Sequence, residues 1–397
     1  MRWLLVVILL GGWWSAAPML AGEDGVDAFL GHHWARPLAF QGTPPAVFPP
    51  LEASLRPEDC GQCHASQYAE WKTSHHSRAM SPGILGQLLA MPATAREEHQ
   101  ACLRCHAPLA EQAESLVAVL SGNEHSFAPQ ASHLDGLTCA GCHVRRHQRF
   151  GPPARGEVSK PASHGGWVAS TAFEDARFCA ACHQFEEDDP ALNGKLLENT
   201  YQEWRQSRYP QAGASCQTCH MPDHRHLWRG IHDPTLVREG VTLTTEPLST
   251  SPGEAGLRLS LRNTGVGHHF PTYVTPRVIM EVWQQDERGK RLEGTHEAYI
   301  IARDVTLDLN REISDTRLPP DGEAVLEYRR SRHVRAATLA WRVRVEPDAF
   351  YLRFYRAVLE MATIHPAEGN DLLRQAIHLA EASPYTLFGE ERRLPAR

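Results

Sequence analysis

The chain has 397 residues, of which 42% are hydrophobic, and its formal net charge is -7. This length and composition suit two or three domains with a sizeable core and exclude a disordered chain. The charge lacks the basic excess that nucleic-acid binding needs, so no nucleic-acid partner is expected. The unusual counts are 10 cysteines and 23 histidines, which indicate that many imidazoles share one role.

The first 21 residues have the pattern of a secretory signal. Arg2 precedes an uncharged apolar run from Leu4 to Trp14, and small residues lead to Ala21 before the first acidic side chains. An uncleaved membrane anchor is the alternative, because the uncharged run is close to membrane length. Either interpretation places the remainder in the periplasm or the extracellular space. Residues 22–55 are then expected to be a linker.

All ten cysteines fall into five Cys-x-x-Cys pairs, and each pair is followed directly by histidine. The motifs are Cys60, Cys63 and His64; Cys102, Cys105 and His106; Cys139, Cys142 and His143; Cys179, Cys182 and His183; and Cys216, Cys219 and His220. Thiols at this spacing can add to the two vinyl groups of one haem, and the next imidazole can bind its iron. Structural zinc, redox thiol pairs and disulfides leave the repeated histidine unexplained. The sequence therefore predicts five covalently attached haem c groups.

Residues 56–235 are expected to form the pentahaem domain, built from short helices, one per motif, and loops. Roughly 32 residues serve each haem, so the haems must supply much of the core. One internal echo stands out, since Tyr68, Glu70, Trp71 and Ser74 recur 133 residues later as Tyr201, Glu203, Trp204 and Ser207. In that alignment His76 falls on Tyr209.

Cysteine is absent after residue 236, and alternating apolar residues appear instead. Runs at 257–261, 278–282 and 341–345, with turns at 286–290 and 319–322, predict a small antiparallel β-sandwich over residues 236–350. From residue 351 to 397 the pattern is helical, with an amphipathic stretch near 371–381. The expected class is an α+β multidomain protein with a haem-packed N-terminal half, a β-sandwich and a helical tail.

Eighteen histidines remain as possible sixth ligands of the irons. The candidates are His76 after the Trp71 and Ser74 frame, His147, His164 before a glycine pair, His232 beside Asp233, and His268 in a glycine-rich turn, with His75, His269, His125, His133, His224 and His226 as rivals or reserves. His147 follows His143 by four residues, so it can serve only a neighbouring haem. No methionine has a convincing ligand setting. Iron bound by two histidines is therefore expected, and such low-spin iron, which has no open position, suits electron transfer.

Three stretches carry a family resemblance: Tyr68 to His76, the run CQTCHMP from Cys216 to Pro222, and GHHFPT from Gly267 to Thr272. Over roughly residues 56–275 the chain resembles the exported multihaem c-type cytochromes related to the tetrahaem electron acceptor of hydroxylamine oxidoreductase. The resemblance favours His76 over His75 and His268 over His269. The β-domain is similar to those appended to some of these cytochromes, including ones that polymerise into extracellular filaments. This chain departs from the pattern in two ways: it has five motifs rather than four, and Tyr209 stands where the internal echo predicts a histidine.

The leading hypothesis is an electron carrier between a donor protein in or near the cytoplasmic membrane and an acceptor further out, and electron transfer is favoured over catalysis. A second hypothesis is a nitrite or hydroxylamine oxidoreductase in which one haem lacks a sixth ligand, with Arg208 and Tyr209 marking the fifth motif as the place. A third is a filament or other homo-oligomer in which His268 or another histidine closes a haem of the neighbouring subunit.

Overall fold

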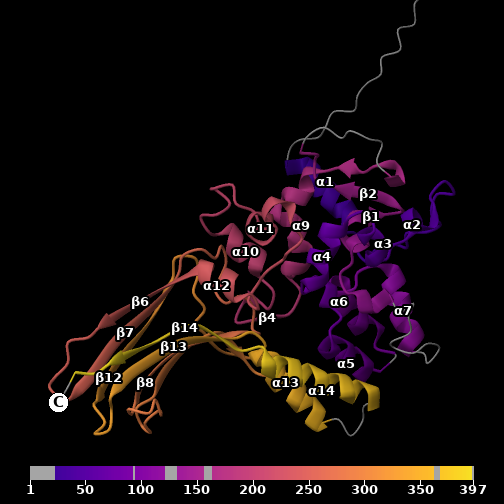
Figure 1. Cartoon of the computed structure of the whole chain (residues 1–397). Coiled ribbons are helices and arrows are strands. Elements are labelled where there is room, and N and C mark those ends of the chain that lie inside the picture. Colours follow the sequence, from indigo (N-terminus) through magenta and orange to yellow (C-terminus); the bar gives the residue numbers. More distant parts are fainter. Residues whose placement is uncertain (1–22, 93, 121–131, 156–162, 362–366, 396–397) are drawn as a thin grey trace, which may run out of the picture.

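The computed structural model describes residues 23–395 except 93, 121–131, 156–162 and 362–366. The expected signal segment lies outside these described residues. Helices gather in the N-terminal half and strands in the C-terminal part, which confirms the α+β class (Figure 1). Within the described residues, no helix is both long and apolar enough to cross a membrane.

The N-terminal half consists of short helices and small strands. The helices are α1 (Glu23–His33), α2 (Pro50–Ala53), α3 (Pro57–Gly61), α4 (Ala65–Thr73), η1 (His76–Arg78), α5 (Pro82–Ala90), α6 (Arg96–His106), α7 (Ala110–Leu120), η2 (Ser132–Asp135), α8 (Cys139–His143), η3 (Ser163–Gly165), η4 (Thr171–Glu174), α9 (Ala176–His183), α10 (Thr200–Arg205), α11 (Cys216–His220), η5 (Pro222–His224) and α12 (Pro234–Gly240). The strands are β1 (Val144–Arg145), β2 (Gln148–Gly151), β3 (Val168–Ala169), β4 (Ala191–Leu192) and β5 (Lys195–Leu196). Each motif lies on a short helix or directly after one.

The segment expected to be a linker contains α1, which is part of the N-terminal half. His33 at its end is buried, and its Nε2 donates a hydrogen bond to the carbonyl oxygen of Cys142 at 2.8 Å. The His33 ring also packs against Phe150, Phe173 and Phe178. These contacts bury the helix against the third motif, which local sequence patterns do not reveal.

The C-terminal part is an antiparallel β-sandwich, as the alternating runs predict. One sheet has the order β14-β13-β8-β9 and the other β12-β7-β6. The strands are β6 (Val241–Pro247), β7 (Glu254–Asn263), β8 (Arg277–Gln285), β9 (Glu297–Ile301), β12 (Glu323–Ser331), β13 (Thr338–Glu346) and β14 (Tyr385–Arg393), with β10 (Arg303–Val305) and β11 (Glu312–Asp315) forming a separate pair. Leu259, Leu261, Met280 and Val343 are fully buried between the two sheets.

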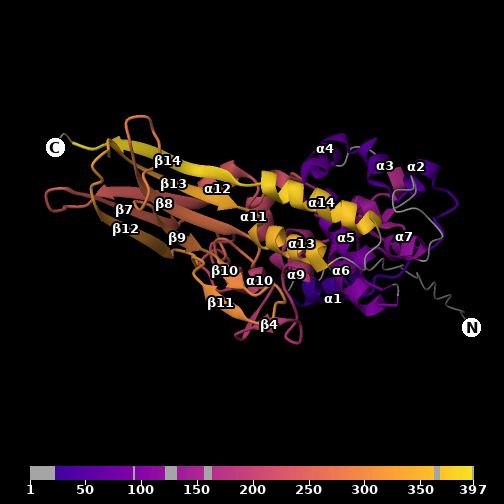
Figure 2. The same cartoon turned by 90° about the horizontal axis from the view of Figure 1, so that it is seen from below.

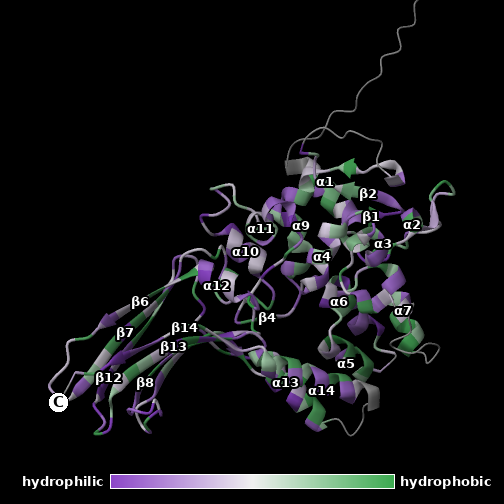
Figure 3. Cartoon of the chain, in the orientation of Figure 1, coloured by the Kyte–Doolittle hydropathy of each residue, from purple (hydrophilic) through white to green (hydrophobic). Residues whose placement is uncertain are grey.

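The C-terminal residues form helices α13 (Ala349–Met361) and α14 (Ala367–Ala382), followed by the strand β14. The two helices run beneath the N-terminal half (Figures 1 and 2). Helices α5 and α14 lie very close at Gly86 of α5, where an added Cβ would lie 3.2 Å from the Leu373 side chain. Hydrophobic and hydrophilic residues alternate along both helices (Figure 3). The helical tail therefore ends at Ala382, and β14 pairs with β13 because Leu387 fits the sandwich core.

Leu259→Ala tests the sandwich core. Leu259 is fully buried, so the substitution should lower the free energy of unfolding by about 2–5 kcal/mol, through lost burial and the cavity left behind. Urea unfolding followed by far-ultraviolet circular dichroism measures the change. Ile313→Ala is the control, because Ile313 is 55% exposed and should change stability by less than about 0.5 kcal/mol. Equal effects of the two substitutions would contradict this account of the core.

Candidate metal centres

The five motifs define sites 1 to 5 in chain order, and the histidine that ends each motif is its motif histidine. All ten cysteines lie within the described residues, and none forms a disulfide. Local caps hold three of the motif helices: Thr138 accepts a hydrogen bond from the Gly141 amide, Asp175 accepts one from Arg177, and Ser215 with Thr218 forms a capping box. In helical conformation the two thiols of a motif share one face.

The motif histidines of four sites have their Nδ1 atoms engaged. His106 Nδ1 donates to the carbonyl oxygen of Ala79 at 2.6 Å, His143 Nδ1 to that of Phe150 at 2.8 Å, and His220 Nδ1 to that of Arg229 at 2.7 Å. At site 4 the partner of His183 Nδ1 is the hydroxyl of Tyr273, at 2.7 Å. Such contacts fix the tautomer and leave Nε2 free for a metal.

Four motif histidines face a second histidine across a gap. The distances between ring centroids are 6.5 Å for His64 and His164, 6.4 Å for His76 and His183, 6.1 Å for His143 and His226, and 6.4 Å for His220 and His268. Two imidazoles bound on opposite sides of one iron, each about 2 Å from the metal, have centroids roughly 6 Å apart. The gaps therefore fit one metal atom each.

Three of the facing imidazoles at sites 4 and 5 are in the form that binds metals. Burial lowers the pKa of His76 to about 3 and the pKa values of His183 and His268 to about 4, so all three are neutral at pH 7. Among the described residues, no group of three histidine, cysteine or acidic side chains is placed to hold a bare metal ion. Two ligands on opposite sides, beside a pair of thiols, fit a haem whose own nitrogens fill the plane.

Three of the five candidate sixth ligands lie opposite a motif histidine. His164 faces site 1, His76 faces site 4 and His268 faces site 5. His76 and His268 are also the members of their histidine pairs that the sequence favours over His75 and His269.

His147 and His232 lie elsewhere. His147 is buried, and its Nε2 donates to the carbonyl oxygen of Gly42 at 2.8 Å, so it fastens the N-terminal segment. His232 Nε2 lies 3.0 Å from a carboxylate oxygen of Asp348, and its ring packs against His75. The Nε2 atoms of both rings are already engaged, and neither ring faces a motif histidine.

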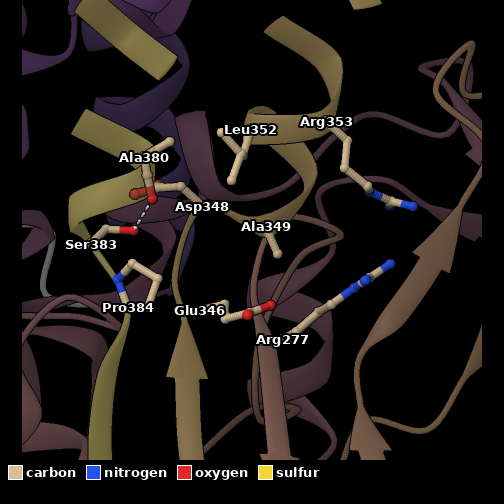
Figure 4. A pocket seen from close by; sticks show the side chains of 9 residues that line it. All are labelled: Arg277, Glu346, Asp348, Ala349, Leu352, Arg353, Ala380, Ser383 and Pro384. Carbon is tan, nitrogen blue, oxygen red and sulfur yellow. Dashed lines mark hydrogen bonds between the residues drawn. The ribbon is translucent and has the colours of Figure 1, made fainter. Parts of the chain in front are cut away.

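Asp348 belongs to a small pocket at the junction of the sandwich with α13 and α14 (Figure 4). Arg277 and Arg353 line this pocket, but both are paired with Asp304, at 2.9 and 3.1 Å. Ser383 donates to the Ala380 carbonyl oxygen at 3.0 Å. The charged side chains of the pocket thus have ion-pair partners within the protein, and the candidate chemistry lies at the histidine pairs.

The sequence echo is a structural repeat. In both copies the tryptophan Nε1 donates to a distant carbonyl oxygen, Trp71 to Leu137 at 2.8 Å and Trp204 to Ala214 at 3.1 Å. The serine hydroxyl three residues later, in Ser74 and in Ser207, donates back to the carbonyl oxygen of its tryptophan. The two copies of the echo therefore form the same local turn.

The glutamates of the echo hold segments that carry facing histidines. Glu70 accepts a hydrogen bond from the backbone amide of His226 at 2.7 Å, and Glu203 accepts one from the amide of His269 at 3.1 Å. His226 faces site 3 and was only a reserve candidate in the sequence. The recurring glutamate was the available signal, but its partners lie 156 and 66 residues away.

Tyr209, which occupies the echo position of His76, has a packing role. An added Cβ on Gly267 would lie 3.3 Å from the Tyr209 ring and 3.2 Å from Trp204. Arg208 is paired with Asp321 and stacks on Tyr209 at 4.8 Å. With His268 facing His220, the fifth motif is not where a second imidazole is missing. The site without a second imidazole is site 2, because no histidine among the described residues faces His106 in this way. The reserve candidate His125 lies outside the described residues.

Comparisons with known proteins agree with this geometry. The sequence family described as cytochrome c554 and c-prime matches residues 59–144, a segment that contains sites 1, 2 and 3. The crystal structure of a penta-heme cytochrome c552 from Thermochromatium tepidum is similar, with a TM-score of 0.58 and 18% identity, over 87% of this chain and all of that one. No curated protein sequence matches the chain. The first match shows that residues 59–144 resemble a family of c-type cytochromes, and the second shows that the fold is similar to that of a penta-heme cytochrome.

Glu70→Ala tests the positioning of His226. Without the carboxylate, the His226 amide and Arg225 lose a common anchor, so a fraction of site 3 iron should lose its second imidazole and become high-spin. Electron paramagnetic resonance of the purified holoprotein measures that fraction. Glu58→Ala is the matched control, since Glu58 pairs only with Arg56 at the surface. An unchanged spectrum for Glu70→Ala would show that Glu70 does not position the ligand.

Proposed function

We propose that the protein is an exported electron carrier with five covalently attached haem c groups. The observation that carries the proposal is the set of four motif histidines that each face a second imidazole at the spacing of one iron. Six-coordinate iron of this kind has no position for substrate and exchanges electrons only. In this assignment His164, His226, His76 and His268 complete sites 1, 3, 4 and 5.

Thiols of different motifs show which sites are neighbours. Three pairs of thiols from different motifs lie close enough to shift one another's pKa: Cys60 with Cys139, Cys105 with Cys182, and Cys179 with Cys216. The corresponding helices also touch: α3 contacts α8, α6 contacts α9, and α11 contacts α9. Site 1 therefore lies beside site 3, and site 4 lies beside both site 2 and site 5.

Trp228 connects the two groups of sites. Its ring centroid lies 5.0 Å from that of His226, which faces site 3, and 4.7 Å from that of His76, which faces site 4. Electrons can thus pass along sites 1, 3, 4 and 5, with site 2 as a branch on site 4.

The exposed ends of this path are sites 1 and 5. Cys63 and Cys219 are the exposed cysteines, whereas the other eight are half-buried. Electrons are exchanged most easily where the haem edge reaches solvent, so we assign the contacts with a donor protein and an acceptor protein to these two sites. Export follows from the signal pattern of residues 1–21 and suits a donor near the cytoplasmic membrane.

A filament is not needed to complete site 5. The observation that suggested one was a candidate ligand, His268, outside the compact haem segment. Within a single chain His268 faces His220, with rings only 13° from parallel. A neighbouring subunit therefore has no ligand to supply there.

Haem content and ligand variants test the carrier. Mass spectrometry of the holoprotein should show five attached haems, and electron paramagnetic resonance of the oxidised protein should show mainly low-spin iron. His226→Ala should make site 3 high-spin and raise its reduction potential, because one donor imidazole is lost. His147→Ala is the control and should leave every iron unchanged. Fewer than five haems, or mainly high-spin iron, would contradict the proposal.

The second candidate function is reduction or oxidation of a small nitrogen compound at site 2. The observation that favours it is that His106, unlike the other motif histidines, faces no described histidine. An open position marks a catalytic metal, and site 4 would exchange electrons with it.

We expect the resting wild-type protein to show one high-spin iron in five, and nitrite or hydroxylamine to change that signal. His125→Ala should have no effect if site 2 is open. A wild-type protein without high-spin iron, together with a new high-spin signal in His125→Ala, would identify His125 as the sixth ligand and remove this candidate.

A further inference from the structure

The motif histidine of site 4 has an unusual hydrogen-bond partner. At sites 2, 3 and 5 the acceptor for Nδ1 is a backbone carbonyl oxygen, whose position the main chain determines. At site 4 it is the hydroxyl of Tyr273, 2.7 Å from His183 Nδ1. Because Nε2 must be free to bind iron, Nδ1 carries the proton. The phenol oxygen therefore accepts a hydrogen bond from Nδ1–H.

Tyr273 reaches His183 from the other half of the molecule. It belongs to the connection between β7 and β8, which also carries His268. Its backbone φ is +64°, in the left-handed region that a bulky aromatic residue rarely adopts. Such conformations persist only where the surroundings impose them, and they concentrate at functional sites.

Two neighbouring side chains orient the hydroxyl group of Tyr273. The Tyr273 hydroxyl lies within hydrogen-bonding reach of the Glu198 carboxyl and the Thr200 hydroxyl. Thr200 donates to Glu198 at 3.1 Å and also contacts the Thr272 hydroxyl at 2.8 Å. Burial raises the pKa of the Glu198 carboxyl well above its usual range. The phenol therefore has one favoured direction, toward His183.

We propose that Tyr273 is a positioning residue that sets the reduction potential of the site 4 haem through His183. This inference rests on the proposed function, since it requires a haem at site 4. An acceptor on Nδ1–H makes the imidazole a stronger electron donor to its metal, which stabilises ferric over ferrous iron. Site 4 is where the path from site 3 meets sites 2 and 5, so its potential governs the distribution of electrons between the branches.

Tyr273→Phe in the full-length holoprotein tests the proposal. The ring and its packing stay, while the acceptor is lost, so one of the five redox transitions should move to higher potential. The loss of one hydrogen bond corresponds to a roughly threefold to tenfold change in the equilibrium constant of that transition. The low-spin electron paramagnetic resonance signal of the same haem should shift. Glu198→Ala, which leaves the phenol free to reorient, should move the same transition in the same direction by a smaller factor.

Tyr328→Phe is the matched control. Tyr328 is a fully buried tyrosine in the sandwich whose hydroxyl donates to the Thr295 carbonyl oxygen at 2.8 Å, remote from the motifs. It should leave all five transitions in place. If wild-type protein carries fewer than five haems, the proposed function fails. If five haems are present and neither Tyr273→Phe nor Glu198→Ala moves a transition, or if Tyr328→Phe moves the same one, only the role of Tyr273 is refuted.

Discussion

The proposed assignment depends on one geometric constraint, which is that two imidazoles from different segments meet across a gap with the spacing of one iron. The members of the four facing pairs are separated in sequence by 100, 107, 83 and 48 residues. Loops that hold such distant groups to a fraction of an ångström need anchors. The N-terminal half supplies them as side chains that bond to remote backbone, such as Trp71 to Leu137 and Glu70 to His226. Short helices suffice because the cofactors supply much of the core.

The same constraint explains the β-sandwich. Its β7–β8 connection delivers His268 to site 5 and Tyr273 to site 4, so the sandwich completes two sites of the other half. Buried arginines fasten the two halves together. Arg317 bonds to Glu203 at 2.9 Å, and Arg303 bonds to the Leu196 carbonyl oxygen at a position that is 1% exposed. Buried networks of this kind are costly to break, and they hold the connection in one position.

Features that depend on local sequence could be predicted, whereas features that depend on contacts between distant residues could not. The motifs and the strands are local patterns, so five sites, the runs of β7, β8 and β13, and the α+β class could be inferred directly. The facing histidines are long-range partners, and a single sequence shows only their neighbours. His76, His164 and His268 stand in distinctive local frames, whereas His226 has none, and its link to Glu70 appears only in three dimensions. β14 was hidden for the same reason, because its partner β13 lies 39 or more residues earlier.

The β7–β8 connection also imposes an order on biogenesis. Synthesis proceeds from the N-terminus, and the last motif is complete at His220, before His268 and Tyr273 exist. In the proposed assignment, a haem attached at site 5 would have one protein ligand until the sandwich has folded and placed His268 opposite His220. His164, in contrast, is present before the fourth motif is made. Under that assignment, completion of site 5 depends on the folding of the downstream domain, whereas site 1 can be completed without it.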